Sequence, residues 1–209
     1  MISKKKLIIP KATDKINNLL EKKIFSHNLA IQSLKKQTKV INKAISLITK
    51  NISLGGKVLL CGNGGSAADA QHLAAEFLVR LRPKINRNPL PALSLLTDVS
   101  TLSACGNDYS FQDIFLRPFK GLAKKNDILI AISTSGKSKN VLKVLKYAKT
   151  KKFKTIGFLG NKGGNAKKYC DFPIVVKSSI TAHIQEAHIF LGHYIFESVE
   201  SAFLKKKNK

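Results

Sequence analysis

Short apolar runs alternate with longer segments of helical periodicity from residue 58 to residue 204. Each run holds four to six residues and is followed by a polar or glycine-rich turn, which is typical of strands buried in a parallel sheet. Strands that alternate with helices predict a three-layer, doubly wound α/β sandwich. We therefore expect five parallel strands, at Val58–Cys61, Ala92–Leu96, Asp127–Ile132, Thr155–Leu159 and Phe172–Val176.

Helices are expected between and after these strands. Ser66 is a favourable N-cap for the first of them, and either Asp98 or Ser100 for the second. Gly106-Asn107-Asp108 predicts a turn between the second and third helices. The expected helical segments are Ser66–Leu81, a short helix that ends near Cys105, Phe111–Ala123, Ser138–Lys151, a short helix ending at Tyr169, and Thr181–Leu204.

The segment before the first strand is also helical in pattern. Apolar residues recur at mixed spacings of three and four from Thr13 to Ile52, which predicts two helices that break near Ser26-His27-Asn28. Gly55-Gly56 is expected to end the second one. An apolar face left over on such helices is a natural oligomer surface. We expect one domain over residues 1–209, with helices in 1–52 that pack on the domain and on an oligomer interface, and an α/β core in 53–204.

Composition adds limits on the class of protein. Hydrophobic residues make up 44% of the 209, which is ordinary for a globular protein, and no apolar run reaches the ~18 residues that span a bilayer. The basic N-terminus is not followed by an apolar segment, so we expect no signal peptide. Three cysteines without metal-like spacing predict reduced thiols in a cytoplasmic protein.

The formal charge of +25 leaves two interpretations open. It could reflect a nucleic-acid or acidic-surface partner, or only a compositional drift toward lysine. Four of the 37 basic residues are arginine, and the lysines are spread through every segment. Proteins that read nucleic acid use arginine for bidentate contacts. We favour the compositional interpretation and do not predict a nucleic-acid partner.

The stretch from Cys61 to Glu76 joins the first strand to the first helix. Its glycines permit positive φ and close approach of a ligand, and the helix that follows directs free N–H groups at the same point. These features predict an anion site. His72 and Glu76 are four residues apart and share a helix face, where they could bind a metal or act as acid and base. The alternative is an ordinary exposed helix pair.

The stretch Ser133-Thr134-Ser135-Gly136-Lys137-Ser138 follows a buried strand and opens a helix. Four hydroxyls in six residues, together with backbone amides, suit a phosphate monoester. A simple serine-rich N-cap is the alternative, although it needs only one hydroxyl. The stretch is not a P-loop, because it lacks the GxxxxGK[ST] pattern.

Three of the five histidines lie in the last helix, at His183, His188 and His193. On helix geometry alone Glu186 aligns best with His193, seven residues on. Gln185 and His193 are roughly 80° apart around the axis, so both could still face one pocket. One or two of these histidines could equally be packing residues.

Four ordered motifs carry a resemblance: CGNGGSAADAQHLAAE, SACGNDYSFQDIF, ISTSGKS and HIQEAHIFLGH. Over about residues 13–203 the chain resembles the sugar-isomerase (SIS) domain family, and within it the phosphoheptose isomerases. The resemblance implies a flavodoxin-like sandwich, a homotetramer and one zinc ion per subunit at a subunit interface. Members interconvert D-sedoheptulose 7-phosphate and D-glycero-D-manno-heptose 7-phosphate, the first step toward the ADP-heptose of the lipopolysaccharide core.

The resemblance also assigns residues. It implies zinc ligands at His72, Glu76, Gln185 and His193, in place of the Glu186 that bare geometry favours, and proton carriers at Glu76 and His193. Family members commonly have arginine where this chain has His183, and some have an acid where it has Ala182. The residues that match substrate contacts are Asn63, Gly64, Gly65, Ser66, Glu76, Asn107, Asp108 and Gln185, with Ser133, Thr134, Ser135 and Ser138 at the phosphate.

Two non-enzymatic alternatives come from the same family. One SIS relative forms the same tetramer and binds the bacterial replication initiator, but it lacks the acid and the imidazole that match Glu76 and His193. This chain keeps both, which favours the enzyme. A sugar-responsive transcription regulator would need a helix-turn-helix before the SIS domain, and residues 1–52 are too short to hold one beside the SIS helices.

Overall fold

A computed structural model of the chain describes residues 13–96 and 98–207. Its centre is a parallel sheet with the strand order β2-β1-β3-β4-β5, which is the flavodoxin-like order. The sheet confirms the predicted sandwich, and each strand lies within two residues of its expected bounds. The strands are β1 (Val58–Gly62), β2 (Ala92–Ser94), β3 (Ile128–Ser133), β4 (Lys154–Gly160) and β5 (Phe172–Val176).

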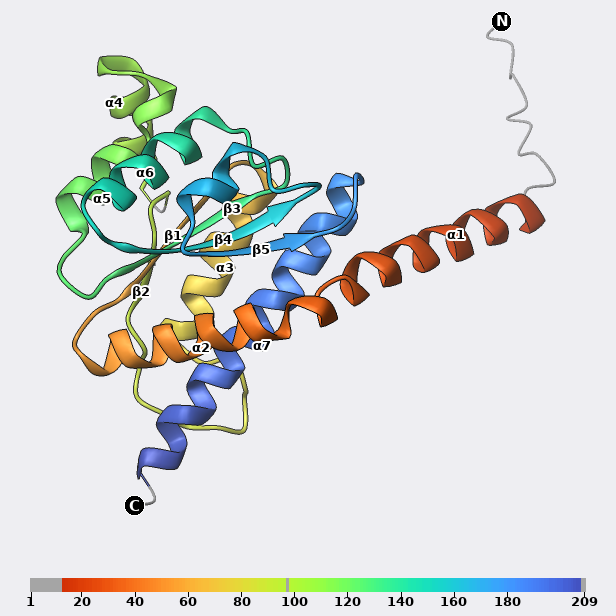
Figure 1. Cartoon of the computed structure of the whole chain (residues 1–209), viewed down its shortest axis with the longest axis horizontal. Helices are drawn as coiled ribbons and strands as arrows, with labels where there is room; N and C mark the ends of the chain where they lie inside the picture. The colour runs from red at the N-terminus through yellow and green to blue at the C-terminus, as the bar shows by residue number, and fades with distance from the viewer. Residues whose placement is uncertain (1–12, 97, 208–209) are drawn as a thin grey trace, which may run out of the picture.

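Helices cover both faces of this sheet (Figure 1). Alternate side chains of β1 point to opposite layers: Val58 and Leu60 pack with α2, α3 and α7, whereas Leu59 and Cys61 pack with α5 and α6. The α-helices are α1 (Thr13–Gln32), α2 (Thr38–Ser53), α3 (Gly65–Leu78), α4 (Val99–Asp108), α5 (Leu116–Leu122), α6 (Lys139–Thr150) and α7 (Thr181–Lys207). The short 3-10 turns are η1 (Lys35–Gln37), η2 (Phe111–Asp113) and η3 (Asn165–Tyr169).

The break between the first two helices comes later than expected. Residues 26–28 lie inside α1, so the prediction of a break there is wrong, and the chain turns at residues 33–37 instead. Tertiary contacts override weak local helix propensity. Gln37 exchanges two hydrogen bonds of 2.8 Å with the backbone of Val175, and the amide of Lys177 donates to the Ser33 hydroxyl at 3.0 Å. The turn therefore covers the open edge of β5.

Three smaller expectations are also wrong. Ser66 is not the N-cap of α3, because Gly64 takes that place with a φ of 55° and Ser66 is buried in the first turn. Gly106-Asn107-Asp108 is the last turn of α4, whose N-cap is Asp98 as expected. The segment 111–123 is split into η2 and α5, because Pro118 inside one continuous helix would clash with the carbonyl four residues before it.

His188 on α7 is fully buried, and its ring lies 6.2 Å from that of Phe158. Burial lowers the pKa of His188 to about 4, and the nearby Leu159 carbonyl offsets only part of this effect. The folded chain therefore leaves this ring neutral, whereas the unfolded chain takes up a proton near pH 6.5. The stability due to the neutral ring is present above pH 6.5 and is lost as the pH falls toward 4.

We expect the His188→Leu variant to be less sensitive to acid than the unchanged chain. The difference between their free energies of unfolding should shift by about 2 kcal/mol between pH 7 and pH 5. Comparing the two chains is essential, because burial raises the pKa of Asp69 to about 6 and this acts in the opposite direction. Urea unfolding at a series of pH values measures the shift. Parallel stability curves for the two chains would contradict the prediction.

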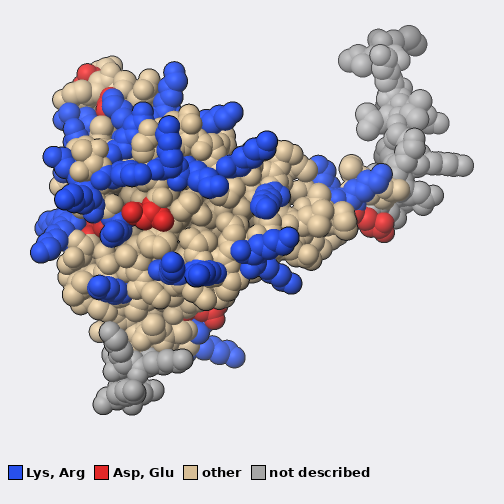
Figure 2. All heavy atoms as spheres, viewed as in Figure 1, with Lys and Arg blue, Asp and Glu red and all other residues tan. Residues whose placement is uncertain are grey.

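Lys and Arg are spread over the whole visible face, with few acidic residues between them (Figure 2). Cys61, Cys105 and Cys170 are free thiols, and burial raises the pKa of Cys170 to about 12, so this thiol is unreactive. Within the described part of the chain, no helix is both long and apolar enough to cross a membrane.

Candidate active site

Three side chains meet where α3 packs against α7. The ring nitrogens Nε2 of His72 and His193 lie 2.8 Å apart, and Nε2 of His72 lies 3.5 Å from Oε1 of Glu76. One donor atom from each of the three residues falls within 4.8 Å of the others. Close helix packing makes this possible, because Gly192 lies so near Leu73 that a Cβ there would meet its side chain. The two helices thus place two imidazoles and a carboxylate around one point.

The donor set fits a zinc ion. Two histidine nitrogens and one carboxylate oxygen are a ligand set that catalytic zinc sites use, with a further position left for water or substrate. The second oxygen of Glu76, Oε2, is buried and has no hydrogen-bond partner among the described residues. An unpaired buried carboxylate oxygen is costly, and a cation beside it would remove that cost. His72, Glu76 and His193 would hold the ion.

The electrostatics of the cluster favour neutral imidazole at His193. Partial burial lowers the pKa of His193, the neighbouring His72 lowers it further, and Glu76 acts in the opposite direction. A metal ligand or a proton acceptor must be neutral imidazole. His193 is therefore suited to either role.

Gln185 lies beside the glycine loop that follows β1. Its side-chain amide lies against Gly65, where a Cβ would overlap it. Gly65 precedes His72 by seven residues, or about 10 Å along the helix. Gln185 thus faces the glycine loop, and its role as a fourth ligand stays a prediction.

Glu186, which bare geometry paired with His193, lies elsewhere. Its carboxylate Oε2 is 2.7 Å from Nδ1 of His27 on α1. The neighbouring His183 is buried and lies 3.3 Å from the Ser26 hydroxyl, also on α1. These contacts fasten the start of α7 to α1. His183 is part of that junction.

The glycine loop after β1 is hydrogen-bonded to the start of α6, directly after the loop that follows β3. Asn63 and Asn140 exchange two hydrogen bonds through their side-chain amides, at 2.8 and 2.9 Å. Asn140 is buried, and sequence reasoning missed it because one asparagine in a polar helix start gives no signal. The pair fixes the spacing between the two loops. Gly64 and Gly65 are exposed beside it, so a ligand could approach their backbone amides.

The serine-rich loop is held by hydrogen bonds within the loop and by close packing on Gly163. The Ser133 hydroxyl accepts from the amide of Gly136 at 3.1 Å and lies 3.5 Å from the Ser138 hydroxyl. Gly136 has a φ of 62°, and a Cβ there would overlap the carbonyl of Gly163. Ser135 accepts from the amide of Lys137 at 3.1 Å. The loop therefore has a fixed shape with hydroxyls and amides at the carboxyl end of β3, where ligands of parallel sheets bind.

Asn107 and Asp108 stand apart from these loops. They are exposed in the last turn of α4, where the Asn107 amide donates to the Asp108 carboxylate at 2.8 Å. In Figure 1, α4 lies at the top left of the molecule, and the label of α7 lies near the lower centre. Their predicted contact with substrate stays a prediction, as do the contacts of Thr134 and Ser66.

An ion network around the buried Glu200 contacts the backbone at the end of α3, where Glu76 lies. Glu200 on α7 is buried and accepts from Nε of Arg82 and from Nε of Arg87, each at 2.6 Å. Arg87 also donates to the carbonyls of Glu76 and Phe77, at 2.7 and 2.8 Å. It thus satisfies the C-terminal end of α3. Arg82 and Arg87 lie between the expected helix Ser66–Leu81 and the expected strand Ala92–Leu96, and the sequence analysis assigned them no role. Only the rarity of arginine among the 37 basic residues could have marked them.

Comparison with known proteins gives consistent matches over most of the chain. The model of the SIS domain family matches residues 25–160. A phosphoheptose isomerase from Clostridium acetobutylicum is 44% identical over 195 residues, which covers 92% of this chain and 98% of that protein.

Solved structures agree with the sequence matches. The phosphoheptose isomerase of Neisseria gonorrhoeae superposes with a TM-score of 0.80 at 34% identity, over 90% of this chain and 98% of that one. The enzyme of Francisella tularensis gives a TM-score of 0.82 at 34% identity, over 91% and 98% of the two chains.

Proposed function

Because the chain belongs to the phosphoheptose isomerase family of SIS-domain proteins and is a sugar-phosphate isomerase, we propose that it converts D-sedoheptulose 7-phosphate to D-glycero-D-manno-heptose 7-phosphate. The observation that carries the proposal is the meeting of His72, Glu76 and His193 between α3 and α7. A non-catalytic member of the fold has no need of a carboxylate and two imidazoles at one point. On the same basis we propose a cytoplasmic enzyme at the first step toward the ADP-heptose of the lipopolysaccharide core.

The reaction moves a proton between C1 and C2 of the sugar through an enediol. Glu76 is the proposed base at carbon, since its buried Oε2 has no competing hydrogen bond among the described residues. An oxygen bound to a metal ion cannot take up a proton, so Glu76 would act as the base only while this oxygen is not bound to the ion. His193, whose pKa is lowered, would exchange protons with the sugar oxygens. A zinc ion bound there would supply Lewis-acid stabilisation of the developing oxyanion. The serine-rich loop would hold the phosphate through its hydroxyls and amides, with Gln185 and the glycine loop on the sugar.

The test is conversion of sedoheptulose 7-phosphate by the purified protein, with and without zinc after treatment with a chelator. We expect aldose formation that is lost on metal removal and restored by zinc, with one ion bound per subunit. Metal content by mass spectrometry is read beside the activity. A well-folded, zinc-loaded protein without turnover would contradict the proposed function and would favour a binding role.

We also propose a homotetramer whose contacts include α1. This helix projects from the body of the molecule (Figure 1). It carries a run of large apolar side chains that are each at least half exposed. Isolated monomers rarely leave such a surface in water. The residues concerned are Leu19, Leu20, Ile24, Phe25 and Leu29.

We expect the Phe25→Glu, Leu29→Glu double variant to lower the oligomeric state. A carboxylate buried in an apolar interface leaves an unpaired charge, which costs several kcal/mol. Light scattering coupled to size-exclusion chromatography measures the mass. The matched control is Lys22→Glu, Lys23→Glu on the exposed part of the same helix, which should leave the mass unchanged. An unchanged mass in the first variant would contradict a role for α1.

A further inference from the structure

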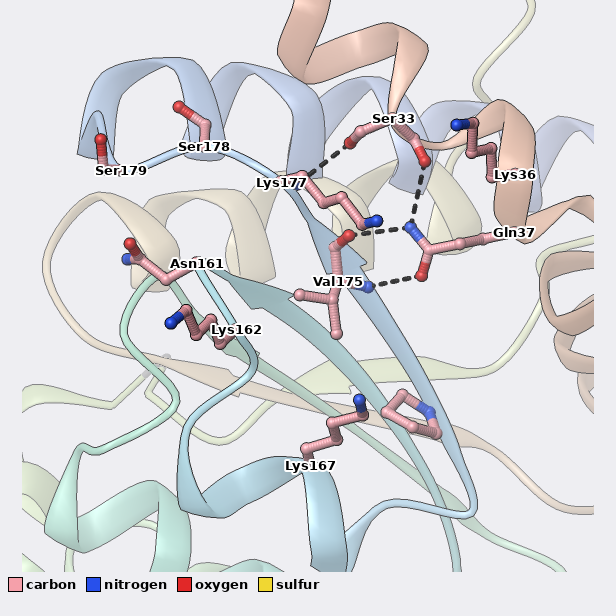
Figure 3. A pocket seen from close by; sticks show the side chains of 11 residues that line it. Ser33, Lys36, Gln37, Asn161, Lys162, Lys167, Val175, Lys177, Ser178 and Ser179 are labelled. Atoms are coloured by element: carbon pink, nitrogen blue, oxygen red, sulfur yellow. Dashed lines mark hydrogen bonds between the residues drawn. The ribbon is translucent and has the colours of Figure 1, made fainter.

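A large basic hollow lies beside the open edge of β5, outside the site described above. It has a volume of about 740 Å³, which is within the range of small-molecule pockets. Its basic residues come from four separate segments: Lys36 from η1, Lys162 from the loop after β4, Lys167 from η3 and Lys177 from the segment directly after β5. Figure 3 shows these side chains arranged around the hollow.

The charge of the hollow exceeds what composition explains. Four of its eleven lining residues are lysine, whereas lysine is about one in six of the whole chain, and none of the eleven is acidic. None of the four ammonium groups has an ion pair or hydrogen bond with another residue that the structure describes. A neighbouring hollow on α2 is also rich in lysine, but Lys39, Lys43 and Lys50 there come from a single helix face. Convergence from separate segments distinguishes the first hollow.

The wall of the hollow is already organised. The two hydrogen bonds between Gln37 and Val175, drawn in Figure 3, hold the helical turn against the strand. The Ser33 hydroxyl fixes the backbone of Lys177. Asn161, Ser178 and Ser179 add polar groups along the rim. A ligand would therefore meet a wall that needs little ordering, which lowers the cost of binding.

We propose that this hollow binds a small molecule with two or more linked phosphates. One phosphate is too small to reach ammonium groups on four segments, whereas a phosphate chain can follow them. Charge-assisted hydrogen bonds from lysine to phosphate are the strong contacts expected here. The inference goes beyond the proposed isomerase reaction, and its test does not need that reaction.

The position of the hollow relates it to the serine-rich loop. Asn161 and Lys162, in the loop after β4, line the hollow. The same loop contacts the serine-rich loop, because the side-chain amide of Asn161 donates to the carbonyl of Thr134 at 3.3 Å. The amide of Ala166 donates to the carbonyl of Gly136 at 2.9 Å. The proposed anion site and the proposed phosphate loop thus share one segment of backbone without sharing lining residues.

The experiment is calorimetric titration of the full chain with inorganic tripolyphosphate and with orthophosphate at one fixed ionic strength. We expect tripolyphosphate to bind at one site per chain and more tightly than orthophosphate. The double variant Lys162→Gln, Lys177→Gln should weaken tripolyphosphate binding by roughly 30-fold or more, which corresponds to the loss of two charge-assisted contacts. The variant Ser179→Glu, which places a carboxylate on the rim, should weaken it as well.

The matched control is Lys39→Gln, Lys43→Gln, which removes the same charge from the neighbouring hollow and should change the affinity by less than about threefold. Equal losses in the two double variants would show a diffuse charge effect and overturn the proposal. Unchanged binding in Lys162→Gln, Lys177→Gln would overturn it too, since the phosphate chain would then bind outside this hollow. Thermal melts of all variants verify that each chain is folded.

Discussion

Replacing Glu76 by glutamine is expected to abolish isomerase turnover while the chain stays folded. The amide has nearly the shape of the carboxylate but cannot accept a proton from carbon at neutral pH. General base catalysis is typically worth a factor of 10² to 10⁴, and a neutral amide is also a poorer zinc ligand. We expect the catalytic rate to fall by about a thousandfold or more.

The matched control for this variant is Glu197→Gln. Glu197 is an exposed acid on α7 whose carboxylate lies 3.4 Å from Arg82 and is not one of the three clustered donor groups. It should keep activity within about threefold, because an exposed ion pair contributes little. Circular dichroism and light scattering establish that Glu76→Gln keeps its fold and assembly. Activity near that of the unchanged chain in Glu76→Gln would remove this residue from the mechanism.

The sheet could be predicted from the sequence, because a buried parallel strand is a local apolar run that ends in a turn. The helix ends do not follow from local pattern alone, because tertiary contacts decide them. The Ser-His-Asn stretch at 26–28 reads as a break, yet His27 is held by Glu186 far along the chain, and the turn forms where Ser33 and Gln37 reach β5. Sequence distance hides such contacts.

The candidate site was predictable in part for a similar reason. His72 and Glu76 share one helix face, so their pairing follows from spacing alone. Their partner on α7 does not, since helical spacing favoured Glu186 and only the resemblance pointed to His193. The hydrogen-bonded amide pair of Asn63 and Asn140 joins the glycine loop to the start of α6, 77 residues away, and has no local pattern at all. The hydrogen bonds from Arg87 to the carbonyls at the end of α3 also have no local pattern in the sequence.

The contacts of Arg87 lead to the largest expected loss of stability, in the variant Arg87→Met. The change leaves the buried carboxylate of Glu200 with Arg82 alone, and it removes the donors to the carbonyls of Glu76 and Phe77. Removing one partner from a buried ion network costs about 3 to 5 kcal/mol, because the remaining charge is not solvated. Urea unfolding should show a lower midpoint with an unchanged slope.

Two further variants separate the network from the mere loss of a positive charge. Arg80→Met removes an exposed arginine from the same segment and should cost less than about 1 kcal/mol. Replacing Arg82, Arg87 and Glu200 together by methionine removes all three charges, so no carboxylate is left stranded, and this triple variant should be more stable than Arg87→Met alone. A triple variant less stable than the single one would mean that packing of the arginine side chains, and not the unpaired charge, sets the cost.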